Sequence, residues 1–301
     1  MKILVTGAAG MLGSAIVPAL RAAGHTVFPT DIDLRYGDVA YLDVREQKAI
    51  GAYVDRIAPE CVVHLAAETD VDKCELQPAH AFETNAEGTR NIAEICRQRD
   101  ILMVHVSTAG VFDGFKKEPY GESDIPNPIN VYGESKFAAE RIVEQLLTKY
   151  FIVRAGWMMG GGIRDKKFVH KILQQIQSGA KQLRVVTDTI GAPTYTVDFA
   201  RCLTVLLETR QYGLYHMACK GSCTRYEVAE KILEYLGRKD ISLIPITSDQ
   251  FPLPARRATS EVMHNLKLDN AGLNHMRDWK VCLREYLYME PAFASLQSQI
   301  Q

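Results

Sequence analysis

The sequence predicts an α/β protein with a doubly wound parallel sheet and a smaller second domain near the C-terminus. Strand-like and helix-like segments alternate through the first half of the chain, as in parallel sheets whose strands are joined by helices. Apolar runs such as residues 61–66 are continuous, which is typical of strands buried on both faces. After residue 157, short elements are mixed with long loops. We therefore predict a first domain over residues 1–157, joined by sheet elements from about 181–217, and a second domain mainly over 158–301.

Each expected element is marked by its apolar spacing and by the residues that end it. Gly24 ends the first helix and Pro59 ends the helix at 45–57. Residues 158–165 are expected to form a flexible glycine-rich loop, and Pro245, Pro252 and Pro254 mark a proline-rich connector. The expected strands are 2–6, 26–30, 41–43, 61–66, 102–107, 151–154 and 183–186, with an extended segment at 191–196. The other expected helices are 14–23, 78–97, 136–150, 168–178, 197–208, 226–236 and 277–288.

Composition and charge exclude several classes of protein. The 301 residues include 35 Lys and Arg against 36 Asp and Glu, and the formal net charge is -1. The sequence contains no basic stripe of the kind that binds nucleic acid and no polybasic arm of the kind that binds a membrane surface. The apolar runs are strand-length and a strand follows Met1 directly, so we expect neither a membrane span nor a signal peptide. Cys219 and Cys223 have neither redox nor the usual zinc spacing, so we expect reduced structural thiols in a soluble, cytoplasmic protein.

A glycine-rich turn between the first strand and the first helix predicts a dinucleotide site. Gly7, Gly10 and Gly13 form the pattern G-x-x-G-x-x-G, with Met11 and Leu12 inside it. The first glycine permits a tight turn, the second lets the backbone approach a pyrophosphate, and the third allows close packing of the helix on the strand. The helix N-terminus then offers free N–H groups to the phosphates. The first domain is therefore expected to be of the Rossmann type.

Asp31 ends the second strand, where a carboxylate accepts hydrogen bonds from the hydroxyls of an adenine ribose. Asp33 could share this role. The negative charge repels a 2′-phosphate, which favours NADH as the cofactor. Arg35 nevertheless leaves some room for NADPH.

Further cofactor contacts are expected where later strands end. Asp43 and Val44 follow the third strand and are candidates for contact with adenine. The next strand is followed by three small or apolar residues, along which the cofactor can lie against backbone. These residues are Leu65, Ala66 and Ala67.

Tyr132 and Lys136 lie one helical turn apart on the same helix face and are the candidate catalytic pair. An ammonium favours the phenolate, so we expect Lys136 to lower the pKa of Tyr132 and also to hold the nicotinamide ribose. Tyr132 would protonate a carbonyl oxygen as hydride arrives from the cofactor. Thr108 would orient that oxygen, with Ser107 as a second donor. For Asn85 two interpretations stay open: a bond to backbone, or a bond to a water in the proton path.

These motifs together resemble the extended short-chain dehydrogenase/reductase family. The glycine pattern, residues 65–67, Asn85, Thr108 and Tyr132-x-x-x-Lys136 carry the likeness. Segments 67–75, 111–114, 127–133, 154–157 and 191–196 are similar to its dTDP-4-dehydrorhamnose reductase branch. The resemblance implies an NAD(P)-binding Rossmann domain followed by a substrate-binding domain. It also implies NAD(P)H-dependent reduction of the C4 ketone of a nucleotide-activated 4-keto-6-deoxysugar, most closely dTDP-4-dehydro-L-rhamnose.

The same resemblance implies where the substrate binds. Thr69 and Val71 would lie beside the sugar, and Trp157 would lie against the sugar or the base. Arg256 or Arg257 would clamp a diphosphate through paired hydrogen bonds. The expected partner is thus a nucleotide sugar, and a homodimer stays open.

The chain departs from the family pattern at a few positions. The family usually reads Ser-Thr-Asp-Tyr-Val-Phe, and here Ala109 and Gly110 replace Asp-Tyr, which should enlarge the sugar site. Related dehydratases need Asp-Glu there to remove water, so elimination is not expected. Ala15 stands where some members place a glutamate near Mg²⁺, so no metal is expected. The alternatives are a sugar-nucleotide epimerase and a regulatory subunit that binds dinucleotide without catalysis.

Overall fold

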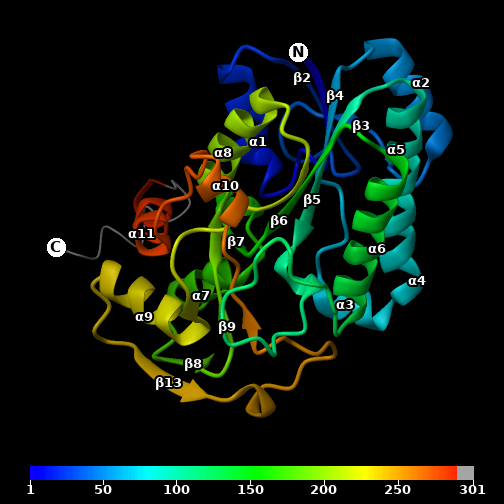
Figure 1. Cartoon of the computed structure of the whole chain (residues 1–301). Helices are drawn as coiled ribbons and strands as arrows, with labels where there is room; N and C mark the ends of the chain where they lie inside the picture. Colours follow the sequence, from blue (N-terminus) through cyan, green and yellow to red (C-terminus); the bar gives the residue numbers. More distant parts are fainter. Residues whose placement is uncertain (290–301) are drawn as a thin grey trace.

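A seven-stranded parallel sheet forms the centre of the molecule (Figure 1). The computed structural model describes residues 1–289. The strand order is β11-β6-β5-β4-β1-β2-β3, and each neighbouring pair is parallel. The order from β3 to β6 is that of a Rossmann sheet, so the predicted fold class is confirmed. The strands are β1 Lys2–Thr6, β2 Thr26–Asp31, β3 Ala40–Tyr41, β4 Cys61–His64, β5 Leu102–Thr108, β6 Tyr150–Ala155 and β11 Gly213–His216.

Both faces of the sheet are buried, because successive residues along a strand point to opposite sides. In β1, Ile3 and Val5 belong to one apolar core and Leu4 belongs to the other. This double burial explains the continuous apolar runs in the sequence. The helices on the two faces, visible in Figure 1, are α1 Gly13–Ala22 and α8 Thr196–Thr209 on one, and α2 Gln47–Ile57, α5 Gly88–Gln98 and α6 Val131–Leu146 on the other.

The second half of the chain adds short strand pairs and helices next to the carboxyl end of the sheet (Figure 1). Its strands are β7 Trp157–Met159 paired with β10 Pro193–Tyr195, β8 Gln182–Val186 paired with β13 Ser242–Ile246, and β9 Ile190–Gly191 between β12 Cys223–Thr224 and β14 Ser260–Glu261. Its helices are α7 Phe168–Gln177, α9 Arg225–Tyr235, α10 Leu266–Asn270 and α11 Trp279–Met289. These pairings bring together segments that are far apart in the sequence.

Two predicted helices have different limits in the structure. The helix expected at 136–150 is α6, which begins at Val131 because the side chain of Asn130 accepts a hydrogen bond from the N–H of Gly133. It ends at Leu146, and Tyr150 already belongs to β6. The helical run expected at 78–97 is divided into α4 Pro78–Phe82, a π turn Glu83–Glu87, and α5.

The prediction of a flexible loop at 158–165 is wrong in part. Met158 and Met159 lie in β7, whose pairing with β10 depends on residues more than thirty positions away, and Gly162–Arg164 forms a 3-10 turn. The connector that contains Pro245 includes the strand β13. A proline is tolerated in this strand because β13 pairs with one neighbour, β8, and so lies at an edge.

The expected domain division stays a prediction. Of the sheet elements expected from about 181–217, β11 joins the central sheet, whereas β8 pairs with β13 outside it. The end of the predicted second domain, residues 290–301, lies outside the described part of the chain.

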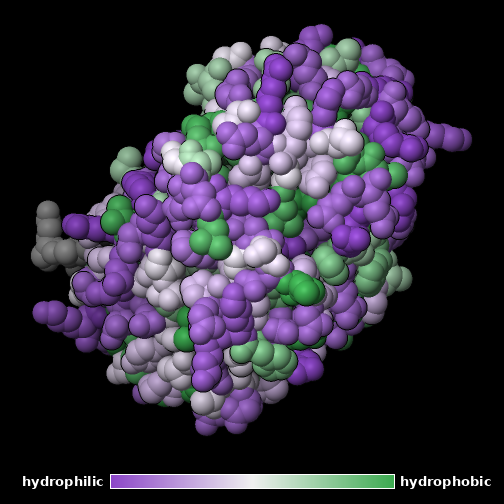
Figure 2. Space-filling view, viewed as in Figure 1, coloured by the Kyte–Doolittle hydropathy of each residue, from purple (hydrophilic) through white to green (hydrophobic). Residues whose placement is uncertain are grey.

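The surface seen in Figure 2 is mainly hydrophilic, with apolar residues in small separate groups. Within residues 1–289, none of the helices combines the length and the apolar character needed to cross a bilayer. All seven cysteines are free and buried.

Candidate active site

The glycine-rich turn packs against the end of β4. Gly7 has a φ of +70°, in the left-handed region that favours glycine. A Cβ at this position would lie 2.5 Å from the backbone nitrogen of Ala66 and 2.7 Å from the carbonyl carbon of Leu65. Of the predicted cofactor residues that follow β4, Leu65 and Ala66 therefore lie beside the turn.

The rest of the turn leads directly into α1. Gly10 is exposed, Met11 is half-buried and Leu12 is buried, and α1 begins at Gly13. An exposed glycine before a helix N-terminus leaves backbone N–H groups open to an anion. These residues fit the pyrophosphate of a dinucleotide.

Asp31 lies at the end of β2 and is held by the glycine-rich turn. Its Oδ2 accepts a hydrogen bond from the N–H of Ala9 at 2.9 Å, and its Oδ1 accepts one from the N–H of Asp33 at 2.9 Å. Asp33 forms an ion pair with Arg35, with 2.6 Å between Oδ2 and Nη2. Each carboxylate oxygen has two lone pairs, so Asp31 retains acceptor capacity for a ribose hydroxyl.

Asp43 and Val44 lie after β3 and are both buried. The side chain of Asp43 faces Arg45, with 2.5 Å between Oδ2 and Nη2, and this guanidinium holds the carboxyl pKa below its ordinary value. Val44 packs against Gly88, where a Cβ would lie 2.8 Å from Cγ2 of Val44. A contact with adenine by these two residues stays a prediction.

Thr108, Tyr132 and Lys136 meet where β5 ends and α6 begins. Thr108 is the last residue of β5, and its side chain lies beside Tyr132 in the first turn of α6. The Nζ of Lys136 donates a hydrogen bond to the carbonyl of Val106 at 2.8 Å and lies 3.4 Å from Nε2 of His105. The Oγ of Ser107, the expected second donor, is buried without a hydrogen-bond partner in the described part of the chain.

The pKa of Tyr132 is raised, not lowered as predicted. Burial raises it to about 12, and the neighbouring Thr108 side chain offsets only part of this effect. Burial also lowers the pKa of Lys136 to about 8. The predicted lowering of the Tyr132 pKa by Lys136 is therefore wrong for this structure, because burial of the phenol raises this pKa.

Asn85 lies in the π turn and connects it to α6. Its Nδ2 donates to Oγ of Ser135 at 2.9 Å and to the carbonyl of Glu68 at 3.0 Å, and its Oδ1 accepts from the N–H of Glu68 at 2.8 Å. Ser135 in turn donates to the carbonyl of Tyr132 at 2.8 Å. Of the two open interpretations, these contacts favour the bond to backbone.

The predicted sugar contacts Thr69 and Val71 flank Asp70, the N-cap of α3 Val71–Leu76. Thr69 is exposed, and its carbonyl and Oγ1 accept hydrogen bonds from Nζ of Lys167 at 2.8 and 3.2 Å. Lys167 precedes α7, so it joins the 67–71 loop to the second half of the chain.

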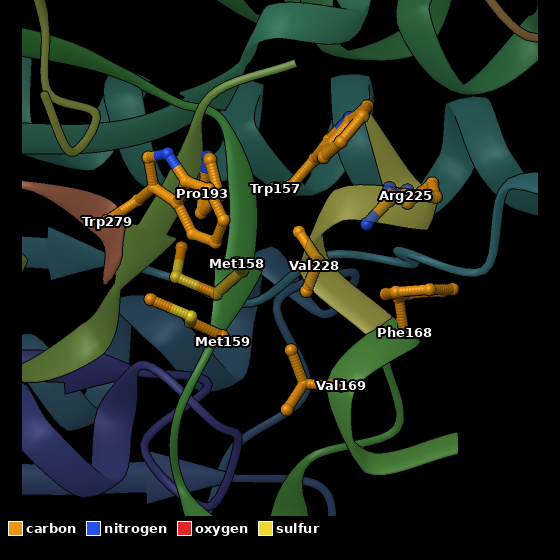
Figure 3. Close-up of a pocket in the computed structure, with 9 residues that line it drawn as sticks. All are labelled: Trp157, Met158, Met159, Phe168, Val169, Pro193, Arg225, Val228 and Trp279. Carbon is orange, nitrogen blue, oxygen red and sulfur yellow. The ribbon is translucent and has the colours of Figure 1, made fainter. Parts of the chain in front are cut away.

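Trp157 lies among residues from three other segments. A Cβ on Gly191 would lie 2.2 Å from Cε2 of Trp157, so the indole rests directly on this backbone. Its Nε1 donates to Oε2 of Glu261 at 2.5 Å. Figure 3 shows the side chain of Arg225 between the rings of Trp157 and Phe168, with Cζ 3.5 and 5.1 Å from the ring centroids. Residues around these rings line a small cavity of about 10 Å³.

Arg256 and Arg257 differ in their surroundings. Arg256 is exposed, and its carbonyl accepts a hydrogen bond from Nδ2 of Asn130 at 2.9 Å. Arg257 forms an ion pair with Asp72, with 2.9 Å between Nη2 and Oδ2. Of the two, only Arg256 forms no ion pair within residues 1–289, so it stays the predicted diphosphate ligand.

Arg225 and Glu261 are site residues that the sequence did not indicate. Each lies in or next to a two-residue strand, where neither strand nor helix periodicity is visible. Two pairings of β9 bring them to Trp157: the pairing with β14 sets Glu261 opposite Gly191, and the pairing with β12 ends one residue before Arg225. Within residues 1–289, no three His, Cys, Asp or Glu side chains are grouped so as to hold a metal ion.

Known proteins resemble this chain along nearly its whole length. A family model described as "RmlD substrate binding domain" matches residues 1–290. A dTDP-4-dehydrorhamnose reductase from Clostridium acetobutylicum has a crystal structure with a TM-score of 0.89 and 37% identity, covering 96% of this chain and 99% of that one. A dTDP-4-dehydrorhamnose reductase from Bacillus anthracis in complex with NADP has a TM-score of 0.89 and 32% identity, with coverage of 96% and 99%.

A curated relative extends the comparison to a different sugar. The "dTDP-4-keto-6-deoxy-D-glucose reductase" of Streptomyces niveus is 34% identical over 283 residues, which cover 94% of this chain and 95% of the relative. These matches confirm the resemblance inferred from the motifs. With the glycine turn, Asp31 and the Thr108–Tyr132–Lys136 group at one edge of a Rossmann sheet, the chain belongs to the RmlD substrate binding domain family.

Proposed function

We propose that this protein is an NAD(P)H-dependent reductase of the C4 ketone of a nucleotide-activated 4-keto-6-deoxysugar. The observation that carries the proposal is the placement of Tyr132 beside Thr108 and one turn before Lys136. This group lies at the carboxyl end of β5, and the glycine turn follows the carboxyl end of β1 in the same parallel sheet. Ligands of such sheets bind at that edge.

Tyr132 is the proton donor in this proposal. With a pKa raised to about 12, the phenol keeps its proton at neutral pH and can donate it to a carbonyl oxygen. Thr108 donates a second hydrogen bond to that oxygen, where negative charge grows only in the transition state. Lys136 holds the nicotinamide ribose, and its ammonium stabilises the phenolate that forms when Tyr132 gives up its proton. The cofactor, when bound, supplies the hydride.

The cofactor is proposed to be NADH, with NADPH also usable. Asp31 lies where the adenine ribose is expected, and its carboxylate disfavours a 2′-phosphate. Arg35 is held by Asp33 in an exposed ion pair, which costs little to exchange for a phosphate partner. The NADP complex of the Bacillus anthracis relative supports the second possibility.

The substrate is proposed to be dTDP-4-dehydro-L-rhamnose, which the names of the relatives support. Thr69, Val71 and Trp157 would lie along the sugar or base, and Arg256 would bind the diphosphate. The relative from Streptomyces niveus, named for a 4-keto-6-deoxy-D-glucose, makes that ketosugar, which differs in configuration at C3 and C5, the second candidate substrate. A cytoplasmic site of action fits the seven free, buried cysteines, since reducing compartments keep thiols unpaired.

A single incubation tests the reaction. Enzyme, NADH or NADPH and dTDP-4-dehydro-L-rhamnose are mixed, and the product is identified by NMR. We expect cofactor oxidation together with a new C4 hydroxyl. An epimerised ketosugar with the cofactor untouched would favour the epimerase instead. Tight cofactor binding with neither reaction would favour a regulatory subunit.

Tyr132→Phe is the matched control for this assay. It removes only the phenol oxygen, so we expect nearly unchanged NADH affinity and a turnover lower by about 10² or more, the scale of general acid catalysis. Fluorescence titration of NADH and steady-state rates measure the two quantities. An unchanged rate would show that the proton donor is another group.

A further inference from the structure

Glu261 reaches the position that the missing side chain of residue 110 would occupy. A Cβ on Gly110 would lie 3.4 Å from Oγ1 of Thr108, 3.6 Å from Cε1 of Tyr132 and 3.7 Å from Oε1 of Glu261. The loss of the family's tyrosine therefore leaves space that faces a carboxylate. The same point lies within 3.7 Å of this carboxylate and of the predicted catalytic residues Thr108 and Tyr132.

One oxygen of this carboxylate is held and the other is free. Oε2 accepts the hydrogen bond from Nε1 of Trp157, and the pairing of β14 with β9 fixes the backbone of Glu261 beside Gly191. Oε1 forms no hydrogen bond within the described residues 1–289, and the side chain is half-buried. When a ligand excludes water from such an acceptor, the loss of its hydrogen bonds to water costs binding free energy. The cost is offset only if the ligand brings a hydrogen-bond donor.

The positive charge of Arg225 offsets the negative charge of Glu261 in a site where further negative charge develops during the proposed reaction. Its guanidinium stacks on Trp157 with Cζ 3.5 Å from the ring centroid (Figure 3), and Glu261 favours its charged form against the effect of burial. The group Arg225–Trp157–Glu261 thus carries opposite charges beside Tyr132.

We propose that Oε1 of Glu261 accepts a hydrogen bond from the C3 hydroxyl of the sugar and makes the enzyme selective for substrates that carry it. This inference rests on the proposed function, in which Tyr132 contacts the C4 oxygen. The carbons next to that carbonyl are C3 and C5. In a 6-deoxy sugar, C5 bears a methyl group. The hydroxyl on C3 is the only neighbouring donor, and a carboxylate prefers a donor to a methyl group.

The test compares two substrates and two variants of Glu261. A dTDP-4-keto-6-deoxyhexose and its 3-deoxy analogue are reduced by the native enzyme, by Glu261→Met, which has similar length and no acceptor, and by Glu261→Gln, which keeps a polar group. We expect the native enzyme to prefer the hydroxylated substrate by about 10- to 100-fold in kcat/KM, as for a hydrogen bond to a charged group. Glu261→Met should lose most of this preference, and Glu261→Gln should retain part of it.

The variant Trp157→Phe distinguishes two roles of Glu261, a hydrogen bond to the sugar and support of the Trp157 indole. It removes the Nε1–H donor and leaves Glu261 in place, so the preference for the 3-hydroxyl should persist even where the overall rate falls. Equal loss of the preference in Trp157→Phe and Glu261→Met would overturn the proposal, because Glu261 would then act only by holding Trp157. Native enzyme without any preference, or Glu261→Met with full preference, would also overturn it.

Failure of the proposed function gives a different result. If the native enzyme reduces neither ketosugar with NADH or NADPH, the reductase proposal fails. Calorimetric affinities for a dTDP-6-deoxyhexose and its 3-deoxy analogue then measure the same preference without catalysis. Thermal unfolding of each variant identifies a folding defect, and in that case Glu261→Gln carries the comparison.

Discussion

Burial acts on Tyr132 and Lys136 in opposite directions on the pKa scale, and for one reason. Each side chain is charged in only one protonation state, and removal of water disfavours that state. The pKa of Tyr132 is therefore raised to about 12 and that of Lys136 is lowered to about 8. The site thus favours the neutral form of each side chain more than water does. A neutral phenol keeps its proton until a carbonyl oxygen is present to accept it.

Lys136 is expected to reduce the stability of the fold at neutral pH. Below pH 8 both the folded and the unfolded chain hold the proton, and the folded chain bears the cost of a buried ammonium. Between about 8 and the ordinary 10.5 the folded chain loses its proton first, so this cost falls as the pH rises. Lys136→Met should therefore raise the free energy of unfolding by about 1–3 kcal/mol at pH 7, with a smaller gain near pH 10.

Urea denaturation at the two pH values measures this effect. A variant that is less stable than the native protein at pH 7 would contradict it, and would show that the hydrogen bond from Nζ to the carbonyl of Val106 contributes more than burial costs.

Asp31 is expected to set the cofactor preference. Asp31→Asn keeps an oxygen acceptor for the N–H of Ala9 and removes the charge that repels a 2′-phosphate. We expect the ratio of kcat/KM for NADPH over NADH to rise about tenfold, since a repulsion of about 1.4 kcal/mol corresponds to that factor. Arg35→Ala is the matched control and should move the ratio the other way. Equal use of both cofactors by all three proteins would exclude the assignment of Asp31.

At the scale of elements, α6 positions the proposed catalytic pair and is anchored at its start and near its middle. Asn130 accepts from the N–H of Gly133 and donates to the carbonyl of Arg256, so it connects the start of α6 to the segment that leads to Glu261. Near the middle of α6, Glu140 forms a buried ion pair with Arg154 of β6, with distances of 2.6 and 2.9 Å. The helix is thus fixed on the sheet by polar contacts as well as by its apolar face.

Loss of the Glu140 carboxylate should destabilise the protein strongly. Both side chains are at most 2% exposed, so Glu140→Leu would leave an unpaired buried guanidinium. We expect the free energy of unfolding to fall by about 3–5 kcal/mol, measured by urea denaturation. The double variant Glu140→Leu with Arg154→Met removes both charges and should recover most of the loss. A double variant no more stable than the single one would show that the ion pair itself is favourable.

At the scale of the whole molecule, the topology brings the site together. The parallel strands β1, β4 and β5 end at the same edge, which places the glycine turn, residues 65–67 and Thr108 side by side. The strand pairs of the second half then add Trp157, Arg225 and Glu261 next to this edge. We expect no cation in this arrangement, because within residues 1–289 no three His, Cys, Asp or Glu side chains are grouped so as to hold one.

Removal of metal ions tests the expectation that the protein needs no cation. We expect EDTA to leave both the rate of ketosugar reduction and the molecular mass in solution unchanged, since Ala15 replaces the glutamate that some relatives use near Mg²⁺. Light scattering with and without EDTA also decides whether the chain is a homodimer. A rate that falls on chelation and returns with Mg²⁺ would contradict the prediction.

The sequence by itself determined those features whose physical cause is local. The alternation of strands and helices, the glycine turn before α1, and the spacing of Tyr132 and Lys136 are set by neighbours within a few residues, and they were enough to predict the sheet and the core of the site. Boundaries were less accurate, because the start of α6 depends on a side-chain cap and β7 depends on a distant partner strand.

Only the tertiary structure decided the features that depend on burial and on contacts between distant segments. The pKa of Tyr132 moves upward because the folded chain excludes water around it, which spacing along a helix does not report. Glu261 joins the site because β14 pairs with β9, although residues 110, 157 and 261 belong to three separate parts of the chain. Local patterns thus predict the chemistry common to the family, and the fold determines which side chains surround its substrate.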